Sequence, residues 1–296
     1  MNAEWTDYVP REGPRRSPAT RIRVLRDLVS QPLGVKRDIM VCLPPSYETS
    51  ALYYPVLYMH DGQNLFDRGT SYAGEWRVDD VVATAARDGF ETIVVGVPNA
   101  RERRIDEYSA FRDRRLGGGH GEGYVAWIAD VLKPLIDGAF RTRRERAATG
   151  MAGSSMGGLI SLWAFFARTD VFGFTAALSP ALWFARRAFF SWLERQPTVQ
   201  GQLYIDAGTE EGPLVLADVA RLRDVLVERG YRLSRDLRCV LETGGRHDEA
   251  SWGRRLPGAL RFMLADVPPA AAATSPPPHA AARLPGHDAA TRRTPQ

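Results

Sequence analysis

Residues 151–158 read "MAGSSMGG" and join a short apolar run to the helix-like sequence "LISLWAFFA". The pattern G-x-S-x-G fits them in one frame only, with Ser155 at its centre, because position 152 is alanine and this excludes Ser154. Glycines at 153 and 157 allow a tight turn from strand to helix that leaves the Ser155 hydroxyl exposed. We therefore predict Ser155 as a nucleophile, with the first helical N–H groups placed for an oxyanion. The alternative is a glycine-rich turn that only packs a helix on a sheet.

Strand-like and helix-like segments alternate on both sides of this turn. Two strands begin the series, and short apolar runs follow; together they cover 20–30, 36–44, 54–60, 91–99, 146–153, 174–180, 202–208 and 238–244. Helical patterns lie between the runs, at 76–88, 121–138, 157–167, 183–195 and 214–229. Such alternation predicts an α/β fold with a mostly parallel central sheet of about eight strands and helices on both faces. Ligands of such sheets bind beyond the carboxyl ends of the strands.

The two ends of the 296-residue chain differ from its middle. Residues 1–19 are rich in Pro, Arg and Glu and are expected to form an N-terminal extension, and 267–296 is a Pro/Ala tract expected to be disordered. Residues 20–266 are predicted to form a single domain, which 44% apolar and 25% charged residues suit.

The composition also indicates where in the cell the protein is expected to be. There is no apolar stretch of eighteen residues, and the start has no apolar core of a secretory signal, so neither a membrane span nor secretion is predicted. Cys42 and Cys239 lie in separate apolar runs and are interpreted as buried thiols. A cytoplasmic protein is expected.

Arginine carries most of the positive charge, since Lys36 and Lys133 are the only lysines and the net charge is +4. Arginines cluster at 101–104, 112–115 and 141–146, interleaved with acidic residues and without a nucleic-acid-binding motif. We expect these clusters to coat a solvated surface, and no nucleic-acid partner.

A serine nucleophile needs a base, and His247 is the candidate. His247 directly follows the last predicted strand, and the order Ser, acid, His is typical of such sheets. His279 and His287 lie in the tail, and His120 lies in a glycine-rich loop. His60 precedes the serine, and we interpret it, with Asp61, as structural.

The acid that orients the base should follow the penultimate strand, "QLYIDAG". Glu211 is preferred, Glu210 is second and Asp218 is third; Asp206 still lies within the strand. A second oxyanion N–H is expected from the loop "YMHDGQNLFD", where Gly62 lets the chain turn inward. The backbone N–H groups of Gln63 and Met156 would then form the oxyanion hole.

Five stretches in order, "YMHDGQNLFD", "SYAGEWRVDD", "GSSMGG", "DAGTEE" and "GGRHDEASW", resemble the esterase D and enterochelin-esterase-like branch of the α/β-hydrolases. That branch includes feruloyl esterases, S-formylglutathione hydrolases and antigen 85 mycolyltransferases. The resemblance covers about residues 20–265. It implies Ser155 as nucleophile, His247 as base and a glutamate of the 210–211 pair as acid; relatives often carry aspartate there, so the acid stays open.

The resemblance also implies a substrate wall in "VPNARERRIDEYSAF", with four candidate residues, Asn99, Arg104, Glu107 and Tyr108. The alternative is a salt-bridged loop. The segment 98–119 is long enough to overhang the site as a partial lid. Trp183 is a further candidate for an apolar wall, or else a core residue at a helix start.

Together these features predict a serine carboxylic-ester hydrolase that needs neither a metal nor an organic cofactor. The partner is a small-molecule ester, and the oligomeric state is left open. The arginines near 101–104 and 112–115 hint at an anionic or polyphenolic acyl group, such as a siderophore or hydroxycinnamoyl ester. The alternatives are an acyltransferase of the same fold and a catalytically silent binding protein.

Overall fold

The computed structural model describes residues 4–11, 17–30, 33–72 and 74–267. The predicted disorder of the Pro/Ala tract falls, except for Val267, outside the described residues.

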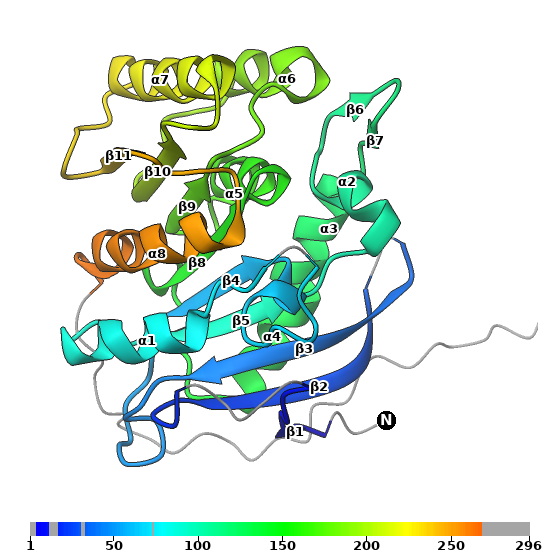
Figure 1. Ribbon diagram of the computed structural model, residues 1–296, viewed down its shortest axis with the longest axis vertical. Helices are drawn as coiled ribbons and strands as arrows, with labels where there is room; N and C mark the ends of the chain where they lie inside the picture. The colour runs from blue at the N-terminus through cyan, green and yellow to red at the C-terminus, as the bar shows by residue number, and fades with distance from the viewer. Residues whose placement is uncertain (1–3, 12–16, 31–32, 73, 268–296) are drawn as a thin grey trace, which may run out of the picture.

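The central sheet has nine strands in the described part of the chain, in the order β1-β2-β3-β5-β4-β8-β9-β10-β11 (Figure 1). The first four in this order pair antiparallel, and the six from β5 to β11 pair parallel. The strands are β1 Thr6–Asp7, β2 Arg21–Ser30, β3 Val35–Leu43, β4 Val56–His60, β5 Ile93–Val97, β8 Thr149–Ser154, β9 Phe174–Leu178, β10 Gln202–Gly208 and β11 Leu237–Glu242.

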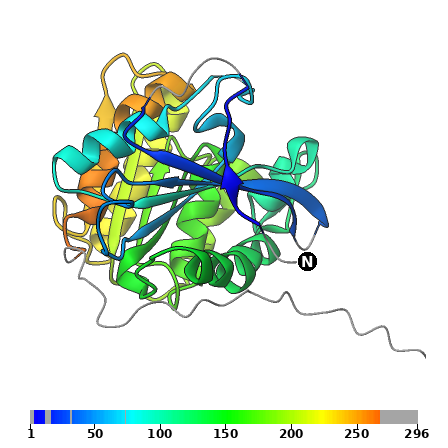
Figure 2. The same ribbon diagram turned by 90° about the horizontal axis from the view of Figure 1, so that it is seen from below.

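Helices cover both faces of this sheet (Figure 2). One face is covered by α1 Val78–Arg87 and α8 Glu249–Leu264. The other is covered by α3 Gly121–Trp127, the π-helix Ile128–Leu132, α4 Lys133–Ala139, α5 Met156–Ala167, α6 Phe184–Leu193 and α7 Pro213–Glu228.

The strands alternate their side chains between two cores, one under each helical layer. In β4, Val56 and Tyr58 belong to the core under α5, while Leu57 and Met59 belong to the core under α1 and α8. A strand buried on both faces has no polar side to place in solvent, and this explains the continuous apolar runs in the sequence.

All eight predicted strands are present, and the predicted fold class is confirmed. The ninth strand, β1, comes from the segment expected to be an extension. Trp5 packs edge-on against Phe140, and the Tyr8 hydroxyl donates to Asp67 at 2.6 Å. Residues 4–11 are therefore packed on the domain. No helix in the described ranges is both long and apolar enough to cross a membrane.

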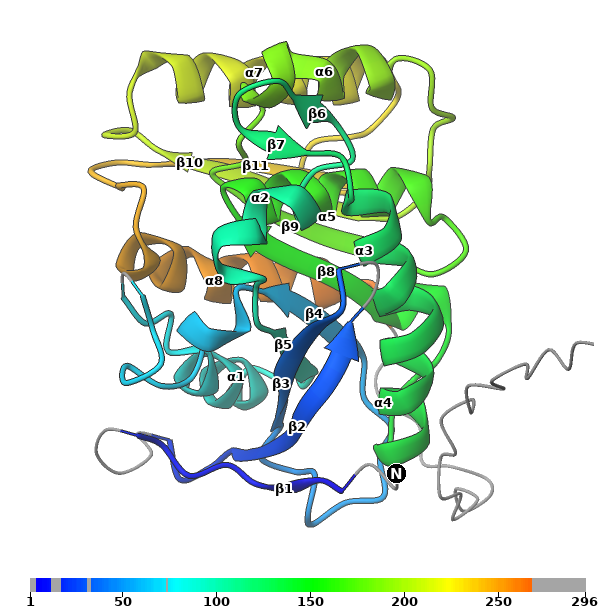
Figure 3. The same cartoon turned by 90° about the vertical axis from the view of Figure 1, so that its right-hand side faces the viewer.

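The segment after β5 is built of short elements. It contains a 3₁₀ turn Arg101–Arg103, α2 Arg104–Glu107 and the hairpin of β6 Arg112–Asp113 and β7 Gly117–Gly118. The hairpin lies beside α6 (Figure 3). A role of this segment as a lid stays a prediction.

Candidate active site

Ser155 lies at the turn between β8 and α5, with φ 55° and ψ −120°. A positive φ is unusual for a residue other than glycine, and it persists only where neighbours hold it. Here the Ser155 N–H donates to the Leu178 carbonyl at 2.9 Å, and the Ser155 carbonyl accepts from the Ala181 N–H at 3.0 Å. The end of β9 and the loop after it therefore hold the turn in this conformation.

The predicted need for glycine before the serine has a direct physical cause. A Cβ at Gly153 would lie 2.9 Å from the Gly157 carbonyl carbon and 2.9 Å from His60 Cδ2. Both contacts are shorter than van der Waals separation, so a larger residue would push the start of α5 off β8. The two glycines of the motif pack against each other and against His60.

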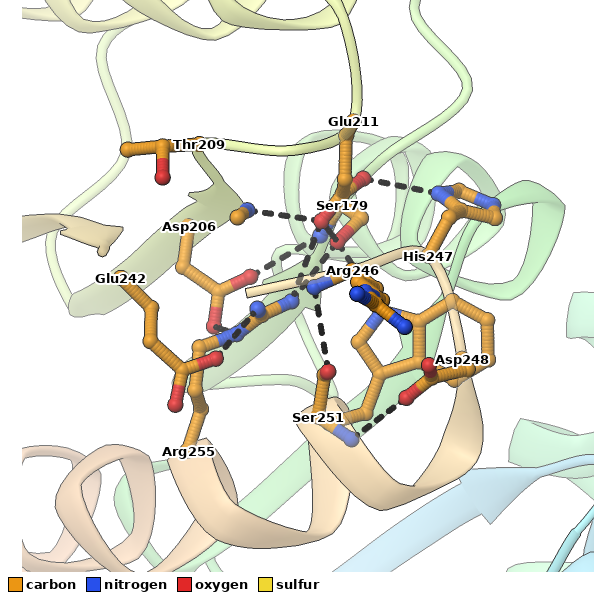
Figure 4. A network of polar contacts seen from close by, with 12 residues as sticks. Ser179, Asp206, Thr209, Glu211, Glu242, Arg246, His247, Asp248, Ser251 and Arg255 are labelled. Atoms are coloured by element: carbon orange, nitrogen blue, oxygen red, sulfur yellow. Dashed lines mark hydrogen bonds and ion pairs between the residues drawn. The ribbon is translucent and has the colours of Figure 1, made fainter. Parts of the chain in front are cut away.

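His247 and Glu211 form a hydrogen bond of 2.8 Å between Nδ1 and Oε2 (Figure 4). His247 is 42% exposed, whereas the Glu211 side chain is completely buried. The other two acid candidates have different partners: Glu210 pairs with Arg246 at 2.7 Å, and Asp218 pairs with Arg187 at 2.6 Å. The structure thus brings the predicted base together with Glu211.

The other carboxylate oxygen of Glu211 accepts from Ser179 Oγ at 2.6 Å, from the Gly208 N–H at 2.7 Å and, more distantly, from Arg255 Nη2 at 3.5 Å. Burial acts to raise the pKa of Glu211, but these bonds and the one from His247 outweigh it and lower the pKa. Glu211 is therefore an ionised, fixed acceptor with Oε2 left for the imidazole.

Ser179 connects Glu211 to a buried arginine. Its Oγ accepts from Trp252 Nε1 at 2.9 Å. It also accepts from Arg255 Nη2 at 2.8 Å (Figure 4). A hydroxyl has one hydrogen to donate and two lone pairs, so the donation to Glu211 and these two acceptances use its whole capacity. Ser179 cannot turn its hydrogen away from Glu211 without leaving a partner unsatisfied.

Arg255 is buried and balanced by carboxylates. It pairs with Asp206 at 2.9 Å and with Glu242 at 3.0 Å, so that α8 is tied to the ends of β10 and β11. The Asp206 carboxylate also accepts from the Ser179 N–H at 3.0 Å. The acid of the His247 pair therefore rests on a charge network that spans several elements.

Sequence reasoning missed Ser179, Trp252 and Arg255. One signal was available for Ser179, because it directly follows β9 at the same edge of the sheet as Ser155. No such signal marks Trp252 or Arg255, which come from the helix after His247.

The two amides predicted to bind an oxyanion begin helical turns. Met156 is the first residue of α5, where an N–H has no intrahelical acceptor. Gln63 lies in the 3₁₀ turn Gly62–Asn64, and its N–H has no backbone partner among the described residues. Both amides follow adjacent parallel strands, β8 and β4, at their carboxyl ends.

Asp61 holds the turn that carries Gln63. Its backbone has φ 54°, and its N–H donates to the Tyr108 hydroxyl at 2.9 Å. Its carboxylate accepts two hydrogen bonds of 2.7 Å from Arg104 and one of 2.6 Å from Asn99. Burial acts to raise the pKa of Asp61, but Arg104 and Asn99 lower it overall. Asp61 is therefore a structural anchor, as its position in the sequence suggested.

His60 lies beneath the glycines of the Ser155 turn. Its Nδ1 is 2.9 Å from the Tyr124 hydroxyl, and burial lowers its pKa to about 3. A fully buried, neutral imidazole in this position is a core residue, which agrees with the structural interpretation of His60.

The predicted wall residues divide into two groups. Asn99 and Arg104 are partly exposed and bind Asp61. Glu107 is fully buried in an ion pair with Arg37, and Tyr108 has no exposed surface, so both lie behind the residues that a ligand could touch.

Trp183 is 47% exposed at the start of α6 and packs edge-on against Phe184. It is therefore not a core residue. Cys42 and Cys239 are free thiols, the first buried and the second partly buried. In the ranges that the structure describes, no group of three or more His, Cys, Asp or Glu side chains could hold a metal ion.

Comparison with curated proteins finds two relatives of interest. The protein YbbA of Bacillus subtilis, which is uncharacterised, is 24% identical over 81% of this chain and 97% of its own length. The siderophore triacetylfusarinine C esterase of Aspergillus fumigatus is 28% identical over 44% of each chain. The match to the second relative thus spans less than half of either protein.

Solved structures share the fold. The BES protein from Bacillus cereus superposes with a TM-score of 0.67 at 18% identity, over 86% of this chain and 98% of that one. The siderophore hydrolase EstB from Aspergillus nidulans superposes with a TM-score of 0.65 at 18% identity, over 88% of this chain and 100% of that one. The enterobactin esterase FES from Shigella flexneri superposes with a TM-score of 0.65 at 17% identity, over 88% of this chain and 61% of that one.

A model of the family described as "Putative esterase" matches residues 30–263, which include the whole sheet from β3 to β11 and both covering helical layers. The fold is of the α/β-hydrolase type, as in these solved structures. The chain therefore belongs to the putative esterase family and is an esterase.

Proposed function

We propose that the chain is a serine carboxylic-ester hydrolase in which Ser155 is the nucleophile, His247 the general base and Glu211 the orienting acid. The observation that carries this proposal is the 2.8 Å bond from His247 Nδ1 to a buried, fully anchored Glu211. Ser155 stands on a strained turn at the same edge of the sheet. This combination is typical of hydrolases that form an acyl-enzyme.

The hydrogen bond to Glu211 fixes which nitrogen of His247 carries the proton. An ionised carboxylate only accepts, so Nδ1 donates and Nε2 is left with a lone pair. That lone pair takes the Ser155 hydroxyl proton as Oγ attacks the ester carbonyl. The positive imidazolium that results is stabilised by the negative charge of Glu211.

The remaining steps follow from this geometry. The N–H groups of Met156 and Gln63 donate to the tetrahedral oxyanion, which collapses as His247 gives its proton to the leaving alcohol. Water then gives a proton to His247 and attacks the acyl group on Ser155. Collapse of the second intermediate releases the acid and restores the serine hydroxyl.

For the substrate, we propose a small acyl ester, with siderophore esters first and hydroxycinnamoyl esters second. The support comes from the names of three similar proteins: the siderophore esterase of Aspergillus fumigatus, the siderophore hydrolase EstB, and a ferulic acid esterase that shares the fold with a TM-score of 0.61 at 19% identity. A panel of p-nitrophenyl, feruloyl, S-formylglutathione and triscatecholate esters would order these classes.

The nucleophile is tested with a fluorophosphonate probe and with p-nitrophenyl butyrate. We expect Ser155→Ala to lose labelling and at least about a thousandfold in kcat, because the adjacent Ser154 hydroxyl is buried at the end of β8 and cannot replace it. The matched control is Ser154→Ala, one residue earlier and buried at the end of β8, which should still be labelled. Equal labelling of wild type and Ser155→Ala would overturn the assignment.

A further inference from the structure

A cavity of about 750 Å³ lies between the β6–β7 hairpin and the start of α6. Four of its six lining residues are arginines, and the lining is Arg112, Asp113, Arg114, Arg115, Ala185 and Arg186. We call it the arginine pocket. The hairpin and α6 lie side by side in both Figure 1 and Figure 3.

The two walls of the arginine pocket are packed on each other. At Gly118 in β7, a Cβ would lie 2.4 Å from the Phe111 carbonyl oxygen and 3.2 Å from the ring of Phe184 in α6. The glycine, at φ 91°, thus lets the hairpin approach the helix closely. The spacing of the arginines on the two walls is set by this contact.

The four arginines differ from those of the 141–146 cluster. In the described ranges, none of them forms an ion pair or a side-chain hydrogen bond, and all are exposed. By contrast, in the 141–146 cluster Arg141 binds backbone carbonyls and stacks on Tyr47, and Arg146 donates to a carbonyl. The 141–146 arginines are thus occupied by the fold, whereas those of the pocket are available to a ligand.

The arginine pocket carries a local excess of positive charge. Its four arginines and one aspartate have a net charge of +3. The Asp113 carboxylate is held by the backbone of the hairpin, because its Oδ1 accepts from the Arg115 and Leu116 amides at 2.8 and 3.0 Å.

The topology places this charge at the same edge of the sheet as the candidate nucleophile. The hairpin follows β5 and α6 follows β9, while β4 and β8 lie between these two strands in the sheet. Ser155 directly follows β8. Ala181, whose N–H holds the Ser155 carbonyl at 3.0 Å, is only four residues before Ala185 of the pocket lining. Four residues span at most about 14 Å, so a substrate of modest length reaches from one to the other.

From these observations we propose that the arginine pocket binds an anionic group, of carboxylate type, carried by the ester substrate at a distance from the scissile bond. The inference rests on the proposed function, because it places the reacting carbonyl at Ser155. Guanidinium groups bind carboxylates through paired, charge-assisted hydrogen bonds, and four unpaired ones in a single hollow suit a group with one or more negative charges.

The test uses substrates that differ only in charge. Mono-p-nitrophenyl esters of linear dicarboxylic acids, with about two to eight methylenes, are compared with the matching ω-amides, which are neutral and nearly isosteric. A second series carries the same acid and amide chains on the phenol of phenyl butyrate and is followed by pH-stat. The measured quantity is the ratio of kcat/KM for acid over amide at each length.

We expect the wild-type ratio to reach about tenfold or more at the chain length that spans the distance, mostly through KM, and to fall as salt rises. In the pocket variant, with all four arginines changed to glutamine, the ratio should fall to about one. The control variant removes four exposed arginines at the opposite, amino edge of the sheet and should keep the ratio; it carries Arg87→Gln, Arg195→Gln, Arg232→Gln and Arg235→Gln.

The proposal is wrong if neither series favours the acid at any length, or if the pocket variant keeps the preference. It is equally wrong if the control variant loses the preference for the acid as completely as the pocket variant does. It is also wrong if free adipate raises turnover of the amide ester, because the pocket would then bind a separate effector. Ser155→Ala separates the two proposals. Turnover that survives this change refutes the nucleophile, whereas turnover that depends on Ser155 without a charge preference refutes the pocket alone.

Discussion

Replacing Glu211 by glutamine changes one atom and should nearly abolish catalysis. Glu211 Oε1 accepts from Ser179 and Gly208, and Oε2 accepts from His247. If the glutamine keeps its oxygen towards Ser179 and Gly208, its NH₂ faces His247 Nδ1, which must then accept. The proton of the imidazole moves to Nε2, the atom that should take the proton of Ser155.

The size of the effect follows from two losses. Restoring the productive tautomer breaks the new hydrogen bond, and the imidazolium loses a charge-assisted bond; each loss is about 2–3 kcal/mol. Together they correspond to a fall in kcat of about 10³–10⁴. Stopped-flow and steady-state assays with p-nitrophenyl butyrate measure this range.

The neighbouring residue supplies the control. Glu210 pairs with Arg246 on the surface and is 50% exposed, so Glu210→Gln should change kcat by less than about twofold. A Glu211→Gln enzyme within tenfold of wild type, or an equal loss in Glu210→Gln, would refute the assignment of the acid.

Three further predictions concern the support of the site. Burial holds the pKa of His60 at about 3, so unfolding takes up a proton, and stability that is complete above about pH 6.5 is lost as the pH falls. Between pH 7 and pH 5, urea titrations should show wild type losing about 2 kcal/mol of unfolding free energy relative to His60→Asn; the same pH dependence in both proteins would contradict this account. A Cβ at Gly62 would lie 2.6–2.7 Å from the backbone of residues 96–98, so Gly62→Ala should lower the free energy of unfolding by about 3 kcal/mol. The control, Gly138→Ala, lies in open space within α4 and should raise the free energy of unfolding by up to about 1 kcal/mol. Thermal unfolding measures both changes. Asp61→Asn leaves the Arg104 charge without its partner, so it should lower the free energy of unfolding by about 2 kcal/mol and change kcat more than KM. The control, Arg103→Gln at the surface, should lower the free energy of unfolding by under about 0.5 kcal/mol. A similar loss of stability in both variants would show that the Asp61 anchor is unimportant.

The strands and the Ser155 turn were predictable because each has a local signature. A strand buried on both faces must be apolar throughout, and a strand-to-helix turn as tight as this one needs its glycines. The strand β1 has no such signature, since it is two residues long and pairs from within a Pro/Arg-rich segment. Helix α8 was not predicted, because Pro257 and two glycines interrupt its pattern; its stability comes from packing and from the Asp248 cap on Ser251.

The sequence ranked Glu211 before Glu210 but held no physical feature that separates the two. Adjacent residues in a turn point in different directions, and the direction here depends on Ser179 and Gly208. The burial of Glu107 was equally hidden, because its partner, Arg37, lies 70 positions earlier in the chain. Such residues are placed by tertiary partners, which a one-dimensional pattern does not contain.

The exposure of His247 has a kinetic consequence. The imidazole is 42% exposed, although the carboxylate that orients it is completely buried. In the proposed mechanism, bulk water therefore reaches the base of the acyl-enzyme without the opening of a lid. The entry of water should therefore not limit deacylation. An acceptor alcohol would then divert the acyl group only in proportion to its concentration against water.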